Sequence, residues 1–238
     1  PPSHAFANDL LVSLTATPLP GIRQAVTRYS VDGSEPTSSS AIYSGPIRIS
    51  ENTTLKAATF YGEGSSAVRS ATSIETYEVV DLADGSVYLS DLVESEVTTY
   101  PGCWARDANY IGGLIRLGGV TYAKGLLVHP RELENGEMLG WVVYDLEGSL
   151  SQATRFSALI GIDDSMLSFH LGSSAFIVEV FRQDEWERVF ESRVFDVGEE
   201  PEKIEVDITG ARKLRLITTD GGDGISCDHS VWGLASVH

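Results

Sequence analysis

Residues 214–237 read LRLITTDGGDGISCDHSVWGLASV, and this stretch decides the expected fold. Leu214 and Leu216 flank Arg215, an alternation typical of a strand with one buried face. The acidic, Gly-rich segment TDGGDG follows, and a closing strand begins near Trp232. Glycine has the most backbone freedom to lose, so ordering this loop is costly. Two explanations stay open: a ligand or cation orders the loop, or its Asp side chains cap their own backbone in a tight hairpin.

The pattern of short strands extends back from this stretch to about residue 87. The segments with strand character are VYLSDL, LIRL, VTYAKGLLVH, MLGWVVYDL, TRFSALIGI, AFIVEVF, ERVFESRVF and KIEVDI. In KIEVDI, Ile204, Val206 and Ile208 point one way and the acidic residues the other. About eight to ten strands over roughly 150 residues predict a jelly-roll-type sandwich for residues 81–238. One short helix is expected over 93–100.

Residues 1–80 also alternate in short runs, which turn signals such as Asp32-Gly33 and Gly45-Pro46 separate. This spacing favours a small β-sandwich, and no helical period of useful length is present. The expected fold class is therefore all-β with two sandwich domains, 1–80 and 81–238. The short junction near 78–85 is not Pro-rich, so we expect semi-rigid coupling.

The 238 residues carry a formal net charge of −17, and the acidic excess lies in the second domain. Residues 1–80 have 5 basic and 7 acidic side chains, whereas residues 81–238 have 12 and 27. Such a field repels phosphate backbones and anionic membranes, so we expect no nucleic-acid partner and no membrane insertion. The same field does not repel neutral sugars or cations, so both are possible ligands. No apolar run reaches the roughly 20 residues of a membrane helix.

One segment of the first domain resembles a known family. The runs YSVDGSEPT (29–37), YSGPI (43–47) and TLKA (54–57) are similar to the chitobiase/hexosaminidase C-terminal domain, an immunoglobulin-like or fibronectin-like spacer. The resemblance covers about residues 10–78 and implies a structural spacer without catalytic residues. Asp32 and Glu35 as a catalytic pair is the alternative, but turn chemistry explains both residues.

The second domain resembles the NPCBM module, a carbohydrate-binding module placed in family 51, over about residues 86–238. The residues that carry the resemblance are Tyr88 to Leu92, Trp104, Asp107, Leu117 to Gly119, Tyr122, Lys124 to Leu126, Val128-His129, Tyr144 to Leu146, Gly161 to Asp164, Val206 to Ala211, Thr219-Asp220, Gly222 to Gly224, Asp228-His229 and Trp232. The resemblance implies a galactose-binding-like β-sandwich, terminal galactose as ligand and a bound calcium ion.

A sugar site needs an aromatic plate and a few fixed polar groups. The candidates are Trp104, Lys124, His129, Asp228 and His229. Trp104 follows Pro-Gly-Cys and is expected in a loop with its ring exposed, although it can instead fold over the sandwich edge.

Lys124 and His129 are five positions apart, which strict alternation places on opposite faces of a strand. A bulge at Gly125 would bring them together. Leu127 and Pro130 stand where the family more often has small residues, so the local rim can differ.

Calcium takes six to eight oxygen ligands, which carboxylates and carbonyls on Gly-rich turns supply. Asp220, Asp223 and Asp228 fit that chemistry, and Asp107 with Asn109 is an equal competitor. We expect the ion to be structural.

Cys103 and Cys227 replace the residues that the family usually has at their positions. Both lie in loops expected near one end, which suggests a disulfide worth about 4–5 kcal/mol in the loop-entropy model. Cys103 as a nucleophile with His229 as base lacks an orienting group. Asp163 and Asp164 are adjacent, so they point apart and cannot flank one glycosidic bond.

The expected function is non-catalytic binding of a terminal galactose-type glycan. We expect the chain to belong to a larger carbohydrate-active enzyme, secreted or at the cell surface, with a covalently linked catalytic domain. A cytoplasmic location stays open because no signal peptide is visible. A hydrolase domain and a protein-interaction module that lost its sugar site are the alternatives.

Overall fold

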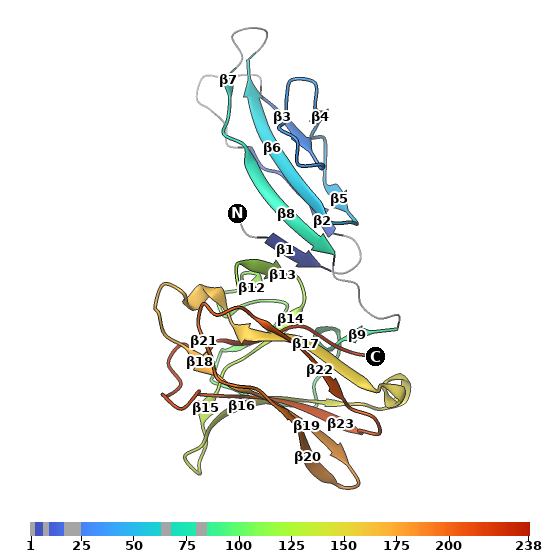
Figure 1. The fold of residues 1–238 in the computed structure, drawn as a ribbon, viewed down its shortest axis with the longest axis vertical. Helices are drawn as coiled ribbons and strands as arrows, with labels where there is room; N and C mark the ends of the chain where they lie inside the picture. Colours follow the sequence, from blue (N-terminus) through green and yellow to red (C-terminus); the bar gives the residue numbers. More distant parts are fainter. Residues whose placement is uncertain (1–2, 7–9, 17–24, 63–67, 80–84) are drawn as a thin grey trace. The chain divides into compact units, whose positions relative to one another are not determined.

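The computed structural model describes residues 3–6, 10–16, 25–62, 68–79 and 85–238 (Figure 1). The chain divides into two compact units, residues 1–81 and 82–238, here called unit 1 and unit 2. The described residues form strands and short 3-10 turns without an α-helix, which confirms the all-β prediction. They contain no helix long and apolar enough to cross a membrane.

The strands of unit 1 are β1 (Ser3–Phe6), β2 (Leu10–Val12), β3 (Ala25–Ser30), β4 (Ala41–Ile42), β5 (Ile47–Ile49), β6 (Thr53–Tyr61), β7 (Val68–Arg69) and β8 (Ser73–Val79). The long strand β6 pairs with β3 and β8, and β1 pairs in parallel with β8. The strands β2 and β5 form a separate two-stranded sheet. Leu55 of β6 and Ile49 of β5 are buried, so each sheet contributes side chains to the core.

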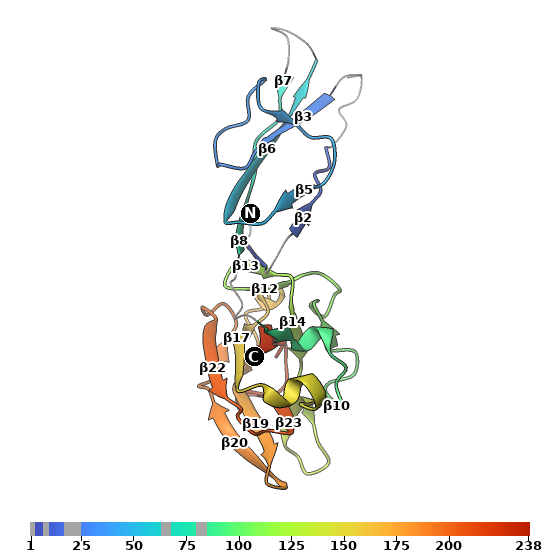
Figure 2. The same cartoon turned by 90° about the vertical axis from the view of Figure 1, so that its right-hand side faces the viewer.

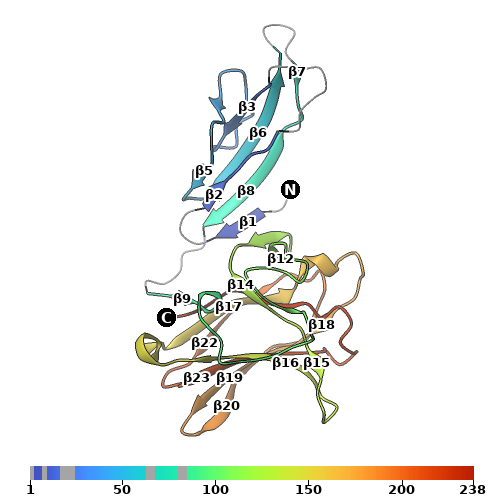
Figure 3. The same cartoon turned by 180° about the vertical axis from the view of Figure 1, so that it is seen from behind.

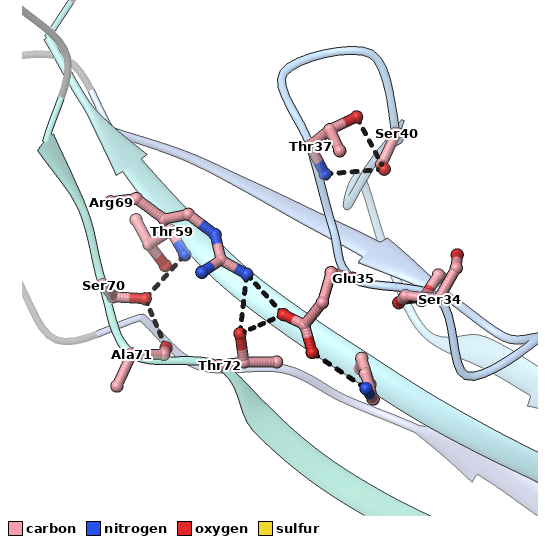
Figure 4. Close-up of polar contacts among 11 residues, drawn as sticks. Ser34, Glu35, Thr37, Ser40, Thr59, Arg69, Ser70, Ala71 and Thr72 are labelled. Carbon is pink, nitrogen blue, oxygen red and sulfur yellow. Dashed lines mark hydrogen bonds and ion pairs between the residues drawn. The ribbon is translucent and has the colours of Figure 1, made fainter.

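The DGSEPT segment is a structural turn (Figure 4). Asp32 Oδ1 accepts hydrogen bonds from the backbone and the hydroxyl of Ser34, and the backbone of Gly33 has a φ of 76°, which favours glycine. Glu35 reaches across to Lys56 and Arg69, each at 2.8 Å, and accepts a hydrogen bond from Thr72. These hydrogen bonds, led by that of Lys56, lower the pKa of Glu35 to about 2. Both acidic residues therefore organise the loop.

Unit 2 contains more strands, joined by three 3-10 turns. In chain order they are β9 (Val87–Tyr88), η2 (Leu89–Asp91), β10 (Glu96–Thr98), β11 (Trp104–Arg106), β12 (Ile115–Leu117), β13 (Val120–Tyr122), β14 (Gly125–Val128), β15 (Arg131–Glu132), β16 (Met138–Asp145), η3 (Gly148–Gln152), β17 (Arg155–Ile162), η4 (Asp164–Met166), β18 (Ser173–Ser174), β19 (Phe176–Arg182), β20 (Glu185–Glu191), β21 (Phe195–Asp196), β22 (Glu202–Asp207), β23 (Lys213–Thr219) and β24 (Ser230–Val237). The helix predicted over 93–100 is wrong, because β10 pairs there with β16.

Unit 2 is a sandwich of two antiparallel sheets, seen as two layers in Figures 1 and 3. One sheet has the order β10-β16-β23-β19-β20, and the other has β11-β14-β24-β17-β22. Trp232 is completely buried between them, with ring centroids 5.1 Å from Phe176 and 6.0 Å from Phe156. The stretch 214–237 thus supplies strand β23 to one sheet and strand β24 to the other.

The hairpin β12–β13 covers the outer face of the second sheet. Leu117, which is buried, lies against Gly161 and Gly233, where an added Cβ would come within 3.4 Å of its methyl groups. Asp163 accepts a hydrogen bond from the backbone of Arg116, and Asp164 accepts one from the backbone of Gly119. Both carboxylates therefore hold the hairpin.

Candidate functional site

Four strand ends of unit 2 lie level at one end of the sandwich. Trp104 pairs with Val128, Val128 with Ser230, and Ser230 with Ile162, across β11, β14, β24 and β17. The residues just beyond these ends therefore follow one another along an edge that we call the rim. They are Cys103, His129, His229 and Asp163. The chain's C-terminus lies at the other end of β24 and faces the viewer in Figure 2.

Two histidines are at the centre of the rim. The rings of His129 and His229 meet edge to face with centroids 4.9 Å apart, and the residues are only 5% and 7% exposed. Thr99 fixes the backbone of His129, because its hydroxyl accepts from His129 N at 3.1 Å and donates to His129 O at 2.8 Å. His129 Nδ1 lies 2.7 Å from Pro130 O, which can only accept. The proton is therefore on Nδ1 and the other ring nitrogen is an acceptor.

His229 is held by a tight turn. Its backbone N–H donates to Cys227 O at 2.7 Å, and its carbonyl accepts from Asp163 N at 2.9 Å. Cys227 has a φ of 69°, which is unusual for a residue other than glycine. Gly172 fits tightly on this turn, since a Cβ there would lie 2.3 Å from Cys227 O. Among the described residues, His229 Nδ1 is buried and has no hydrogen-bond partner.

Both imidazoles are neutral near pH 7. Burial lowers the pKa of His129, and burial together with the neighbouring His129 lowers the pKa of His229 to about 4. A neutral imidazole has one donor and one acceptor nitrogen. The pair can therefore both give and receive hydrogen bonds, as reading a hydroxyl group requires.

Two exposed tyrosines extend the histidine pair into a row of four rings. Tyr100 lies 5.5 Å from His129 and Tyr110 lies 4.2 Å from His229, measured between ring centroids. The tyrosines are 46% and 40% exposed. Exposed rings beside fixed polar nitrogens match the needs of a saccharide, whose C–H face packs on aromatic rings. We call these four residues the aromatic row.

Neither tyrosine is among the site residues predicted from the sequence. Tyr100 precedes the Pro101-Gly102 turn, and Tyr110 precedes Ile111-Gly112-Gly113. An aromatic residue beside a Gly-containing turn is the sequence signal that marks both tyrosines, as it marks Trp104.

The predicted loop position of Trp104 is wrong. The residue begins strand β11 instead of lying in a loop, and it pairs with the core residue Val128. Residues opposite each other on paired strands point to the same face. The Trp104 side chain accordingly packs against the core and is only partly exposed.

The predicted pairing of Lys124 with His129 is also wrong, because the two residues flank opposite ends of β14. Lys124 forms ion pairs with Asp91 and with Asp107, the latter at 2.9 Å. Lys124 therefore belongs to a charge network away from the aromatic row, and its two carboxylate partners satisfy it there.

The acidic loop folds around Ser173. Asp228 is completely buried and its Oδ1 accepts from Ser173 N at 2.9 Å, while Asp223 accepts from the Ser173 hydroxyl at 2.9 Å. Asp220 turns back to the backbone of Gly222. Burial, with added repulsion from Asp223 and Asp220, raises the pKa of Asp228 to about 8. Asp228 is thus an internal support of the turn that carries His229.

The three aspartates do not form the predicted ligand set. Across the described ranges no group of three or more His, Cys, Asp or Glu side chains is placed to hold a metal ion. In the competing pair, Asp107 accepts from Gly125 N and Lys124, and Asn109 shapes its own loop through Gly113 N and Leu114 O. Asp228 Oδ2 is buried without a partner in this part of the chain, which is the one feature that a cation would satisfy.

The predicted disulfide is not formed. Cys103 and Cys227 are both free and partly buried. Cys103 lies in the turn after Tyr100, and Cys227 is held in the positive-φ turn under His229. Each is thus fixed by its own turn. Burial raises the pKa of Cys103, which opposes the role of an activated nucleophile.

Comparisons with known proteins identify both units. Residues 85–238 match the family model of the NPCBM/NEW2 domain, and residues 1–72 match that of the chitobiase/beta-hexosaminidase C-terminal domain. No curated protein matches the chain.

Among solved structures, the chain is similar to the CBM51 of Clostridium perfringens GH95, solved with methyl-galactose. The identity is 32% and the TM-score 0.55, over 64% of this chain and 99% of that module. Tandem CBM51 modules of Sp3GH98 from Streptococcus pneumoniae share the fold at 17% identity and a TM-score of 0.52, over 89% of this chain and 70% of that one.

A fragment of Clostridium perfringens ZmpB with CBM51-2 and INT domains, solved with GlcNAc, is 23% identical with a TM-score of 0.54. The alignment covers 79% of this chain, which spans only 37% of that fragment. The NPCBM/NEW2 model covers more than half of the chain, and the 32% identical module is matched almost along its whole length. The chain therefore belongs to the NPCBM/NEW2 domain family.

Proposed function

We propose that unit 2 binds a neutral galactose-type saccharide at the aromatic row. The single observation that supports this most is the row itself: two neutral, buried histidines between two exposed tyrosines. Tyr110 supplies a face for the sugar's C–H groups, and His129 and His229 read its hydroxyls. The similar module solved with methyl-galactose supports the choice of sugar.

The chemistry proposed is binding without bond cleavage. A glycosidase needs two carboxyl groups facing each other across a bond, about 5–10 Å apart. At the rim, Asp163 and Asp164 are occupied by the β12–β13 hairpin and Asp228 by Ser173. In the proposal, the chain is an ancillary part of a larger, secreted or cell-surface carbohydrate-active protein. A similar structure from Clostridium perfringens ZmpB, in which an M60 catalytic domain occurs with the CBM51-1 and CBM51-2 domains, supports such an arrangement.

Calorimetric titration with methyl galactoside tests the function. Wild type is expected to bind weakly, and Tyr110→Ala and His229→Gln to lose at least tenfold in affinity. Lys124→Gln, which sequence reasoning placed in the site and the structure does not, is expected to keep wild-type affinity. Absence of heat with any galactoside would overturn the proposal. Hydrolysis of a galactoside reporter would favour the hydrolase alternative. Wild-type affinity in both Tyr110→Ala and His229→Gln would show that the aromatic row is not the binding site.

Calcium stays a separate proposal, supported by the unpartnered buried oxygen of Asp228. A cation there would offset the cost of a buried carboxylate. Thermal unfolding with calcium and with a chelator tests it. Calcium is expected to raise the Tm of wild type and not that of Asp228→Asn, and equal Tm values in wild type would contradict it.

A further inference from the structure

Five exposed apolar residues lie in the two loops that adjoin His229, and we call them the apolar collar: Ile111, Leu114, Leu167, Phe169 and Leu171. Their exposed fractions lie between 43% and 68%. They come from two loops that both adjoin His229. The first loop carries Tyr110, whose ring contacts His229, and the second leads into Gly172, which fits against Cys227 in the His229 turn.

The collar holds five of the nine large hydrophobic side chains that are exposed in the described part of unit 2. Within the described part of that unit, the other large hydrophobic side chains that are exposed are Tyr100, Tyr110, Val93 and Val194. Two of these four belong to the aromatic row. Apolar side chains gathered around a binding site, in contrast to isolated ones, indicate a contact surface.

The collar loops carry no charged side chain. Residues 108–115 and 165–178 contain no Lys, Arg, Asp or Glu, although residues 81–238 hold 27 acidic and 12 basic residues. Burying these loops therefore removes no charge from water. Protein interfaces usually have a polar rim, and the collar loops offer no charged side chain that could pair with such a rim on a partner. An uncharged, apolar environment suits it best.

We propose that the module recognises the short saccharide headgroup of a glycolipid in an uncharged bilayer, with the collar entering the membrane interface. The proposal rests on the galactose-type binding proposed above and names the form in which the sugar is presented. In this proposal, a sugar held by Tyr110 and His229 directs its aglycone toward the two collar loops, which adjoin His229. Interfacial apolar groups enter about 5–10 Å, so only a headgroup of one or two sugars lets both contacts form.

Vesicle co-sedimentation tests the proposal, with phosphatidylcholine vesicles that contain galactosylceramide, a lipid with a long neutral glycan ending in galactose, or no glycolipid. Wild type is expected to bind galactosylceramide vesicles best. Phe169→Ser and Leu171→Ser are each expected to weaken that binding roughly tenfold, the change that about 1.4 kcal/mol of apolar burial produces. Val93→Ser, at an exposed apolar residue outside the collar, serves as the matched control and is expected to bind like wild type.

Calorimetry with soluble methyl galactoside separates the two proposals, because both collar variants are expected to keep the wild-type affinity for it. If methyl galactoside binds but the collar variants sediment like wild type, the collar proposal is overturned and the sugar site stands. The collar substitutions can instead abolish self-association, or binding to a lipid-free glycoprotein, and leave vesicle binding unchanged. The collar would then contact a second copy or another protein, and the membrane proposal is overturned. Absence of binding to every galactoside overturns both proposals.

Discussion

At the scale of single residues, burial decides what the histidines of the rim can do. An exposed imidazole would be partly charged near pH 6.5, whereas His129 and His229 stay neutral because charging them inside the protein is costly. The hydrogen bond to Pro130 selects the tautomer of His129. His229 therefore stays neutral from pH 7 down to its pKa of about 4, and burial shifts the pKa of His129 in the same direction.

The substitution His229→Gln is expected to change how stability depends on pH. Between pH 6.5 and about 4 the unfolded chain binds a proton at residue 229 that the folded chain does not, so wild-type stability falls as the pH falls through this window. The loss amounts to roughly 3 kcal/mol of unfolding free energy. Urea unfolding of both proteins from pH 8 to 4 checks this: the variant lacks that part of the decline. Parallel curves would contradict the assigned pKa.

A second residue-scale prediction concerns Gly172, which has a φ of 112° and fits against Cys227 O. Gly172→Ala is expected to cost about 2–4 kcal/mol of unfolding free energy, through backbone strain and overpacking, and to weaken sugar binding by displacing His229. Gly224→Ala is the matched control, since Gly224 also has a positive φ, of 95°, but no neighbouring atom within 4 Å. Chemical denaturation measures the unfolding free energy of both variants. Equal losses of unfolding free energy would show that the tight fit of Gly172 against Cys227 has no role.

At the scale of elements, the rim is built by register. Level strand ends place residues from β11, β14, β24 and β17 side by side, although they are far apart in the sequence. The hairpin β12–β13 keeps this sheet covered, and the carboxylates of Asp163 and Asp164 hold the hairpin. Asp163 is completely buried, so water cannot easily reach the backbone N–H of Arg116 if the carboxylate is removed.

Asp163→Ala is accordingly expected to lower the unfolding free energy by about 1–3 kcal/mol, because it leaves the backbone N–H of Arg116 without its acceptor. Asp145→Ala removes an exposed ion pair with Lys213 and is expected to cost less than about 1 kcal/mol. Thermal and urea unfolding of the two variants measure the difference. A cost for Asp163→Ala no larger than for Asp145→Ala would contradict the role given to the buried carboxylate.

The fold was readable from the sequence because its strands alternate, as Ile204 and Val206 against Glu205 and Asp207 show. Both family resemblances are confirmed by the family models. The site was less readable. The register of strand pairing decides which strand ends meet, and the local patterns of a single sequence do not reveal it. Trp104 was therefore expected outside the core, and Lys124 was expected beside His129. Tyr100 and Tyr110 depend on loop conformations that local patterns do not determine.

At the scale of the whole molecule, charge selects among ligands. Residues 81–238 carry a strong acidic excess, so the overall field of the module repels an anionic sugar and does not repel a neutral one. A sulfated galactoside is therefore expected to bind more weakly than the neutral one. The difference should shrink as salt rises, because salt screens charges beyond about 10 Å at 0.1 M.

Titrations of both ligands at low and high ionic strength make the measurement, and the affinity of the neutral galactoside is expected to stay constant as its internal control. Tighter binding of the sulfated ligand at low salt would show that a local cation outweighs the general field.

The proposed sugar site combines residues held by strands with residues carried by loops. His129 and His229 are attached directly to β14 and β24, whereas Tyr100 and Tyr110 are carried by connections that can lengthen, shorten or change composition without shifting the sheet. If the proposed site binds the sugar, substitutions in these two loops are expected to change which saccharide binds while the two imidazoles stay in place, so a library of loop variants is the place to select altered specificities.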